Sequence, residues 1–171
     1  MVYALITVYN PTKPIWDNIR AVAGQVDRVC ICDNSDCAQT PSLPENSRYW
    51  AFGENLGISQ AYNRVLTDSS VPWQDGDYLF FLDQDSRCSE THVRDLLSIY
   101  EPLTAQGHRV GSLGPAIFNT CRGTVEFPRM KTPLETGVYT VSGIITSSML
   151  CTYGNLRSVG FWNEKVFLDM A

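Results

Sequence analysis

Tyr78–Ser86 reads YLFFLDQDS, in which five mostly apolar residues run directly into two carboxylates, Asp83 and Asp85. An apolar run of this length is typical of a strand that is buried on both faces. A strand that needs cover on both faces belongs to a sheet packed between helices. The stretch therefore predicts an α/β fold with a mostly parallel, twisted sheet and helices on both faces.

The rest of the chain repeats this unit, because short apolar runs alternate with helical stretches along it. Pro14 is well placed to open the first helix, since proline is favoured at the start of helices. A small hairpin region is expected near the C-terminus. We predict strands at 2–8, 28–32, 49–52, 77–82 and 110–117, helices at 14–24, 59–66 and 90–100, and hairpin strands at 124–127 and 137–141.

Size and charge restrict the function. The 171 residues fit one domain, 1–171, and the stretch Phe167–Ala171 stops in mid-pattern, so we expect a domain truncated at its C-terminal end. The net charge is −5 and there is no long basic run, which argues against binding to nucleic acid. A small anionic ligand would need a local cation to offset its charge.

The sequence also favours a cytoplasmic location. Met1–Tyr9 has no basic leader, and no stretch approaches the ~18 apolar residues of a membrane span. The six cysteines show no paired metal-binding spacing. Cys30, Cys32 and Cys37 could be imagined as a zinc site, but buried thiols in a strand are the favoured interpretation.

Polar side chains follow three of the predicted strands. Thr7, Tyr9 and Asn10 follow the first strand, Asp33 and Asn34 the second, and the Asp83/Asp85 pair the fourth. Ligands of parallel α/β sheets bind beyond the carboxyl ends of the strands, so these clusters are expected at one edge of the sheet. Asp33 is also compatible with an ordinary turn that it stabilises itself.

Asp83 and Asp85 are candidate metal ligands. Two nearby carboxylates repel each other unless a cation lies beside them, and Mg²⁺ or Mn²⁺ takes oxygen ligands while leaving positions for phosphate. The alternative is a solvated turn in which Asp85 caps the next helix. Asn55, Gly57 and Asn63 carry the same ambiguity, because Gly57 also suits a tight helix entry and the two asparagines could fix a sugar or the metal loop.

The order of these motifs resembles family-2 glycosyltransferases of the GT-A fold. The residues that carry the resemblance are Ile6–Asn10, Asp33–Ser35, Asn55–Gly57 with Ala61 and Asn63, and Phe81–Ser86. The DQDS form, with Gly114-Pro115, Ser142-Gly143 and Val159–Trp162 after it, is most similar to the bacterial rhamnosyltransferase branch that builds O-antigen and related polysaccharides.

The resemblance implies roles for individual residues. Nucleotide contacts are implied for Thr7, Tyr9, Asn10, Asp33, Asn55, Gly57, Asn63 and Asp83, metal binding for Asp83 and Asp85, and the sugar or acceptor wall for Ser142, Gly143 and Trp162. An acidic stretch that carries the catalytic carboxylate in this branch begins at Phe167. Asp169 is therefore expected to be either that base or its neighbour.

The implied activity is inverting, metal-dependent transfer of a sugar, expected to be L-rhamnose from dTDP-rhamnose, to a glycan or lipid-linked acceptor. We expect the domain to lie in the cytoplasm at the inner face of the bacterial plasma membrane, through its missing part, and to form a homodimer. One alternative is a module that binds the donor without transferring it. The other is a phosphatase of the haloacid-dehalogenase type, which also uses a strand followed by Asp-x-Asp.

Overall fold

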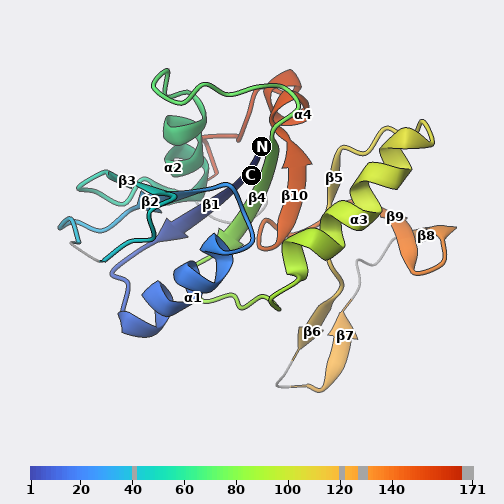
Figure 1. Ribbon diagram of the computed structural model, residues 1–171, viewed down its shortest axis with the longest axis horizontal. Coiled ribbons are helices and arrows are strands. Elements are labelled where there is room, and N and C mark those ends of the chain that lie inside the picture. Colours follow the sequence, from blue (N-terminus) through green and yellow to red (C-terminus); the bar gives the residue numbers. More distant parts are fainter. Residues whose placement is uncertain (40–41, 120–121, 127–130, 167–171) are drawn as a thin grey trace.

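The computed structural model describes residues 1–39, 42–119, 122–126 and 131–166, and a six-stranded sheet lies at its centre (Figure 1). The strand order is β3-β2-β1-β4-β10-β5. The four strands β3, β2, β1 and β4 are parallel, whereas β10 runs antiparallel to both β4 and β5. Their bounds are β1 Val2–Val8, β2 Arg28–Asp33, β3 Ser47–Ala51, β4 Tyr78–Asp83, β5 Ser112–Leu113 and β10 Met149–Thr152.

Helices cover both faces of this sheet. Side chains of α1 (Lys13–Ala23) and α3 (His92–Ala105) pack on one face, where they meet the β1 residues Ala4, Ile6 and Val8. On the other face, α2 (Gly57–Leu66) and α4 (Tyr153–Ser158) contribute to the core that contains Tyr3 and Leu5 of β1 (Figure 1). Alternate residues of β1 thus enter different cores, as the period of two in a strand requires.

The predicted α/β class is confirmed, and several predicted elements need new bounds. The strand predicted at 110–117 is two short strands, β5 and β6 (Ile117–Asn119), separated by Gly114-Pro115. Proline has no N–H to donate to a sheet, which explains the break. The third helix ends at Ala105 instead of Tyr100 and contains Pro102. Strand β10 was not predicted.

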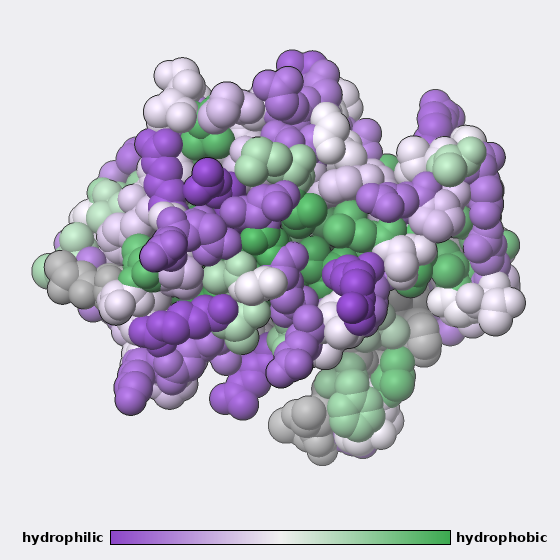
Figure 2. All heavy atoms as spheres, in the orientation of Figure 1, coloured by the Kyte–Doolittle hydropathy of each residue, from purple (hydrophilic) through white to green (hydrophobic). Residues whose placement is uncertain are grey.

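Two hairpins extend from the sheet after β5. In the first, β6 pairs with β7 (Thr124–Glu126), and in the second β8 (Lys131–Glu135) pairs with β9 (Val138–Val141). The predicted hairpin region is confirmed, but its two predicted strands belong to different hairpins, and β8 was not predicted. Phe118 and Val125 face each other across the first hairpin and are more than half exposed. Figure 2 shows the resulting hydrophobic surface at the lower edge of the molecule. Among the described residues, no helix is both long and apolar enough to span a bilayer.

Candidate functional site

The parallel register brings the predicted polar clusters together. Val8 at the end of β1 lies opposite Asp33 at the end of β2, and Thr7 lies opposite Asp83 at the end of β4. The carboxyl ends of the three strands therefore meet at one edge. The predicted placement of these clusters is confirmed, while the roles of the individual residues stay predictions.

A pocket of about 260 Å³ opens at this edge. Its lining combines five residues predicted to bind nucleotide with four others, and none of the nine, all within the described ranges, is Lys or Arg. An anionic ligand in this pocket would therefore need a cation other than a lining side chain. The lining residues are Thr7, Val8, Tyr9, Asn34, Asn55, Gly57, Ile58, Asp83 and Gln84.

Asn34, a member of the polar cluster predicted after the second strand, lines the pocket together with Gln84, for which no role was predicted. The Asn34 amide donates to the carbonyl of Gly57 (3.2 Å) and accepts from the N–H of Leu56 (3.3 Å), so it joins the end of β2 to the start of α2. The Gln84 side-chain oxygen accepts the N–H of Tyr9 at 2.9 Å. The sequence signal for each residue is its position, since Asn34 directly follows Asp33 and Gln84 lies between Asp83 and Asp85.

Asp33 is fully buried below the pocket. Its Oδ1 accepts the N–H of Ser35 at 2.7 Å, and its Oδ2 accepts a short hydrogen bond from the hydroxyl of Tyr49 on β3. The first contact is the self-stabilised turn that the sequence left open as an alternative. In this arrangement both carboxylate oxygens support the end of β2.

This contact makes Tyr49 a sensitive position for stability. Burial, together with the hydrogen bond to Asp33, raises the pKa of Tyr49 from 10.0 to about 12. A raised folded pKa adds stability that is present below pH 10 and is lost as the pH rises toward 12. We expect Tyr49→Phe to cost about 1–2 kcal/mol at pH 7, because a buried carboxylate loses a donor. It should also reduce the fall in stability between pH 10 and 12.

Urea unfolding of the wild type and Tyr49→Phe at several pH values measures both effects. Tyr139→Phe is a matched control because Tyr139 lies on an exposed hairpin strand, far along the chain from Asp33. Equal stability of Tyr49→Phe and wild type at pH 7 would mean that the Asp33–Tyr49 contact does not hold β2 to β3.

The start of helix α2 forms another side of the pocket. Asn55 Oδ1 accepts the N–H of Gly57 at 3.1 Å, and Gly57 has a φ of +74°, a left-handed conformation that glycine adopts without strain. Gly57 and Ile58 line the pocket directly. Thr7 approaches from β1 and donates its hydroxyl to Tyr62 of the same helix at 2.8 Å. The partial positive charge of a helix N-terminus therefore lies beside the pocket.

Asn10 and Asp85 lie at the open side of this edge, and both are exposed. The N–H of Asn10 donates to the hydroxyl of Ser35 at 2.8 Å, which links the loops after β1 and β2. Asp85 lies in the turn that follows β4, where the N–H of Ser86 donates to the carbonyl of Asp83 at 3.1 Å. Tyr9, 44% exposed, is the one aromatic residue among the nine that line the pocket.

Asn63 is used by the fold and does not line the pocket. Its amide nitrogen donates to the carbonyl of Trp162 and to Glu164 Oε1, both at 2.9 Å, and its Oδ1 accepts the N–H of Trp162 at 3.0 Å. The ring of Trp162 packs edge-on against Phe81, with the ring centres 5.3 Å apart. The structure thus places both predicted site residues at the junction of α2 with residues 162–164.

The remaining predicted residues are also away from the pocket or outside the described part of the chain. Ser142 and Gly143 are exposed and do not line it. Asp169, the predicted catalytic residue or its neighbour, lies outside the described residues.

The described residues offer few side chains that could hold a metal ion. Across the described ranges, no group of three or more His, Cys, Asp or Glu side chains is arranged to hold a metal ion. Cys30 and Cys32 are buried in β2 and Cys37 is exposed, in keeping with the interpretation of buried thiols in a strand. Asp83 and Asp85 fit a different kind of site, because Mg²⁺ is commonly held by one or two carboxylates plus phosphate and water.

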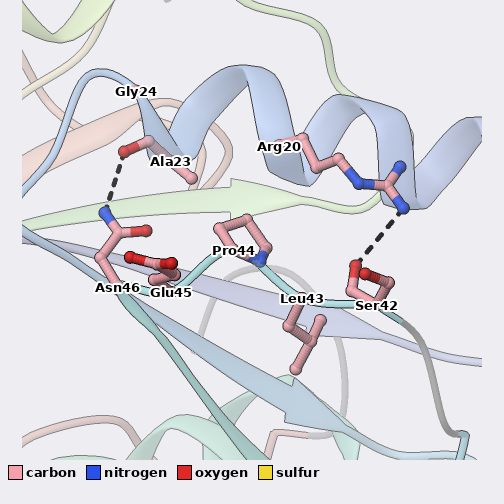
Figure 3. Close-up of a pocket in the computed structure, with 8 residues that line it drawn as sticks. All are labelled: Arg20, Ala23, Gly24, Ser42, Leu43, Pro44, Glu45 and Asn46. Carbon is pink, nitrogen blue, oxygen red and sulfur yellow. Dashed lines mark hydrogen bonds between the residues drawn. The ribbon is translucent and has the colours of Figure 1, made fainter.

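A second pocket, of about 600 Å³, lies at the opposite edge of the sheet, where α1 ends and the chain enters β3 (Figure 3). Asn46 donates to the carbonyl of Ala23 at 3.0 Å, and Arg20 donates to the carbonyl of Ser42 at 3.4 Å. These polar groups join α1 to the segment before β3. The amino ends of parallel strands are not where such sheets bind ligands, so the smaller pocket is the better candidate.

No family model and no curated protein matches this chain. Among solved structures, S. aureus TarS 1–349 superposes with a TM-score of 0.61 at 15% identity, over 96% of this chain and 50% of that one. Francisella tularensis 2-C-methyl-D-erythritol 4-phosphate cytidylyltransferase (IspD) superposes with a TM-score of 0.49 at 12% identity, over 95% and 82%. The chain therefore spans half the length of the TarS fragment, and the likeness to TarS shows that it has the same GT-A-like, mostly parallel α/β fold.

Proposed function

We propose that the chain is the nucleotide-sugar-binding domain of a glycosyltransferase and that the donor binds in the 260 Å³ pocket. The observation that carries the proposal is the pocket itself, at the carboxyl ends of β1, β2 and β4, with Asp83 of Asp-x-Asp in its lining. This is where parallel α/β sheets bind their ligands. TarS, whose fold the chain shares, is a glycosyltransferase, which supports the same class of activity.

The charge of the pocket supports a metal–diphosphate as the bound group. The lining contains Asp83 and no basic residue, and the exposed Asp85 lies two residues further along. We propose that these carboxylates bind Mg²⁺ or Mn²⁺, which offsets the charge of the diphosphate as the bond to the sugar breaks. The N-terminus of α2, at the other side of the pocket, favours the same negative charge.

The remaining groups divide the work of binding and transfer. Tyr9 provides an exposed ring against which the base is held, and Asp83 accepts hydrogen bonds from the ribose. A carboxylate at or beside Asp169 takes the proton of the acceptor hydroxyl, which then attacks the anomeric carbon from the side opposite the nucleotide. Attack from that side inverts the configuration of the sugar.

The donor and acceptor are proposed from the motifs. The DQDS form at 83–86 and the order of the other motifs favour family 2, with dTDP-rhamnose as donor and a bacterial glycan or lipid-linked glycan as acceptor. The second candidate is a module that binds the donor nucleotide without transferring the sugar, and the transfer assay distinguishes the two.

Two measurements test the proposal. Calorimetry of dTDP with Mn²⁺ and with EDTA is expected to show binding only when the metal is present. The phosphatase alternative does not predict metal-dependent binding of dTDP. Incubation with dTDP-rhamnose and a lipid-linked acceptor then distinguishes the transferase from the binding module. Failure to bind dTDP under both conditions would contradict the proposal.

A further inference from the structure

The turn before β10 contacts the Asp83–Ser86 turn, although some sixty residues separate them in the sequence. The hydroxyl oxygens of Ser147 and Ser86 are 2.7 Å apart, and Ser147 also accepts the N–H of Asp83 at 3.4 Å. Ser147 is only 9% exposed. A buried hydroxyl thus connects the first and last residues of the turn that carries both candidate metal ligands.

The backbone fixes Ser147 in this position. The N–H of Ser148 donates to the carbonyl of Phe81 at 2.8 Å, and the N–H of Met149 donates to the carbonyl of Thr146 at 3.0 Å. Ser148 has a φ of +65°, which is strained for a residue with a side chain. Such a conformation persists only where its surroundings enforce it, so the turn is held firmly against the end of β4.

We propose that Ser147 is a positioning residue that holds the Asp83–Ser86 turn in the geometry needed to bind a metal–diphosphate. The inference rests on the proposed function. Two carboxylates on a turn repel each other when no cation is bound, and this repulsion favours other conformations of the turn. Anchoring the turn at Asp83 and at Ser86 limits those conformations, so that less ordering is needed when the metal binds.

The same contact connects two parts of the proposed site. Ser147 lies in the segment 142–148 between β9 and β10, which also contains Ser142 and Gly143. Ser147 thus joins the segment between β9 and β10 to the turn that carries the candidate metal ligands.

The experiment compares Ser147→Ala, Ser86→Ala, the double variant and Ser147→Thr. The Mn²⁺ concentration that gives half-maximal dTDP binding is measured by calorimetry. We expect Ser147→Ala to raise this concentration about tenfold, the size of effect expected from losing one hydrogen bond. Ser86→Ala should raise this Mn²⁺ concentration to a similar extent. The double variant should need no more Mn²⁺ than the weaker-binding single variant, because both changes remove the same contact. Ser147→Thr keeps the hydroxyl and should bind like the wild type.

Ser98→Ala is the matched control, since Ser98 is exposed on α3 and bonds only within its own helix. Absence of Mn²⁺-dependent dTDP binding in the wild type would contradict the proposed function itself. If the wild type binds dTDP and Ser147→Ala needs the same Mn²⁺ concentration as the wild type, the inference about Ser147 is overturned while the proposed function stands. The same holds if Ser147→Ala loses dTDP affinity by an equal factor at every Mn²⁺ concentration. If Ser147→Ala does not fold, Ser86→Ala provides the same test from the other side of the contact.

Discussion

Replacing Asp85 by alanine is expected to abolish metal-dependent nucleotide binding and to leave the fold intact. Asp85 is exposed beyond the end of β4, whereas the core strand before it is buried. The pocket lining has no basic residue that could take over the neutralisation of a diphosphate. Replacing a residue that hydrogen-bonds to a metal ligand typically weakens metal binding by about 10–100-fold. Loss of a ligand itself should therefore weaken metal-dependent dTDP binding by at least about 100-fold.

Calorimetry with dTDP and Mn²⁺ measures the effect, and urea unfolding checks the fold, for which a change within about 0.5 kcal/mol is expected. Asp17→Ala is the matched control, because Asp17 is an exposed carboxylate on α1 that pairs with Arg20. Asp85→Asn separates charge from shape and should behave like alanine. Equal dTDP affinity in wild type and Asp85→Ala, with Mn²⁺ present, would show that Asp85 does not hold the metal.

The parallel core of the fold could be predicted because its signals are local. Strands β1, β2 and β4 are continuous apolar runs that end in polar turns, and the predicted bounds differ from the observed ones by at most one residue. Strand β10 has four residues and pairs antiparallel with β4, so neither its length nor its neighbours distinguish it from a loop. The break at Gly114-Pro115 was readable in principle, since proline rarely lies inside a sheet.

The pocket residues that could be predicted are those at the carboxyl ends of predicted strands. Thr7, Tyr9 and Asp83 reach the pocket because they lie at or just after the carboxyl ends of strands that the sequence predicts. The part played by Ser147 depends on how two distant turns pack, and no spacing in the sequence encodes that contact. For Asn63 the resemblance predicted a nucleotide contact, but the structure shows its side chain bonded to Trp162 and Glu164 and absent from the pocket lining.

The contacts of Asn63 lead to the second large effect, a loss of stability in Asn63→Ala. The side chain is 8% exposed and makes three hydrogen bonds, two with the backbone of Trp162 and one with Glu164. Alanine leaves these groups without that partner, and we expect a cost of about 3 kcal/mol. A direct nucleotide contact, as the family resemblance implies, predicts instead weaker dTDP binding with little change in stability.

Asn63→Asp sharpens this test, because aspartate has the same shape but places a carboxylate next to Glu164 Oε1. Repulsion between the two should raise their pKa values, so the variant gains stability as the pH falls below about 5 and loses it again toward neutral pH. Urea unfolding at pH 4.5 and 7, with Asn18→Ala on α1 as the control, measures this difference. Wild-type stability in Asn63→Ala, together with a large loss of dTDP affinity, would return Asn63 to the nucleotide site. A large loss of stability with unchanged dTDP affinity, the expected result, would assign Asn63 to holding residues 162–164 against α2, the helix whose N-terminus lies at the pocket.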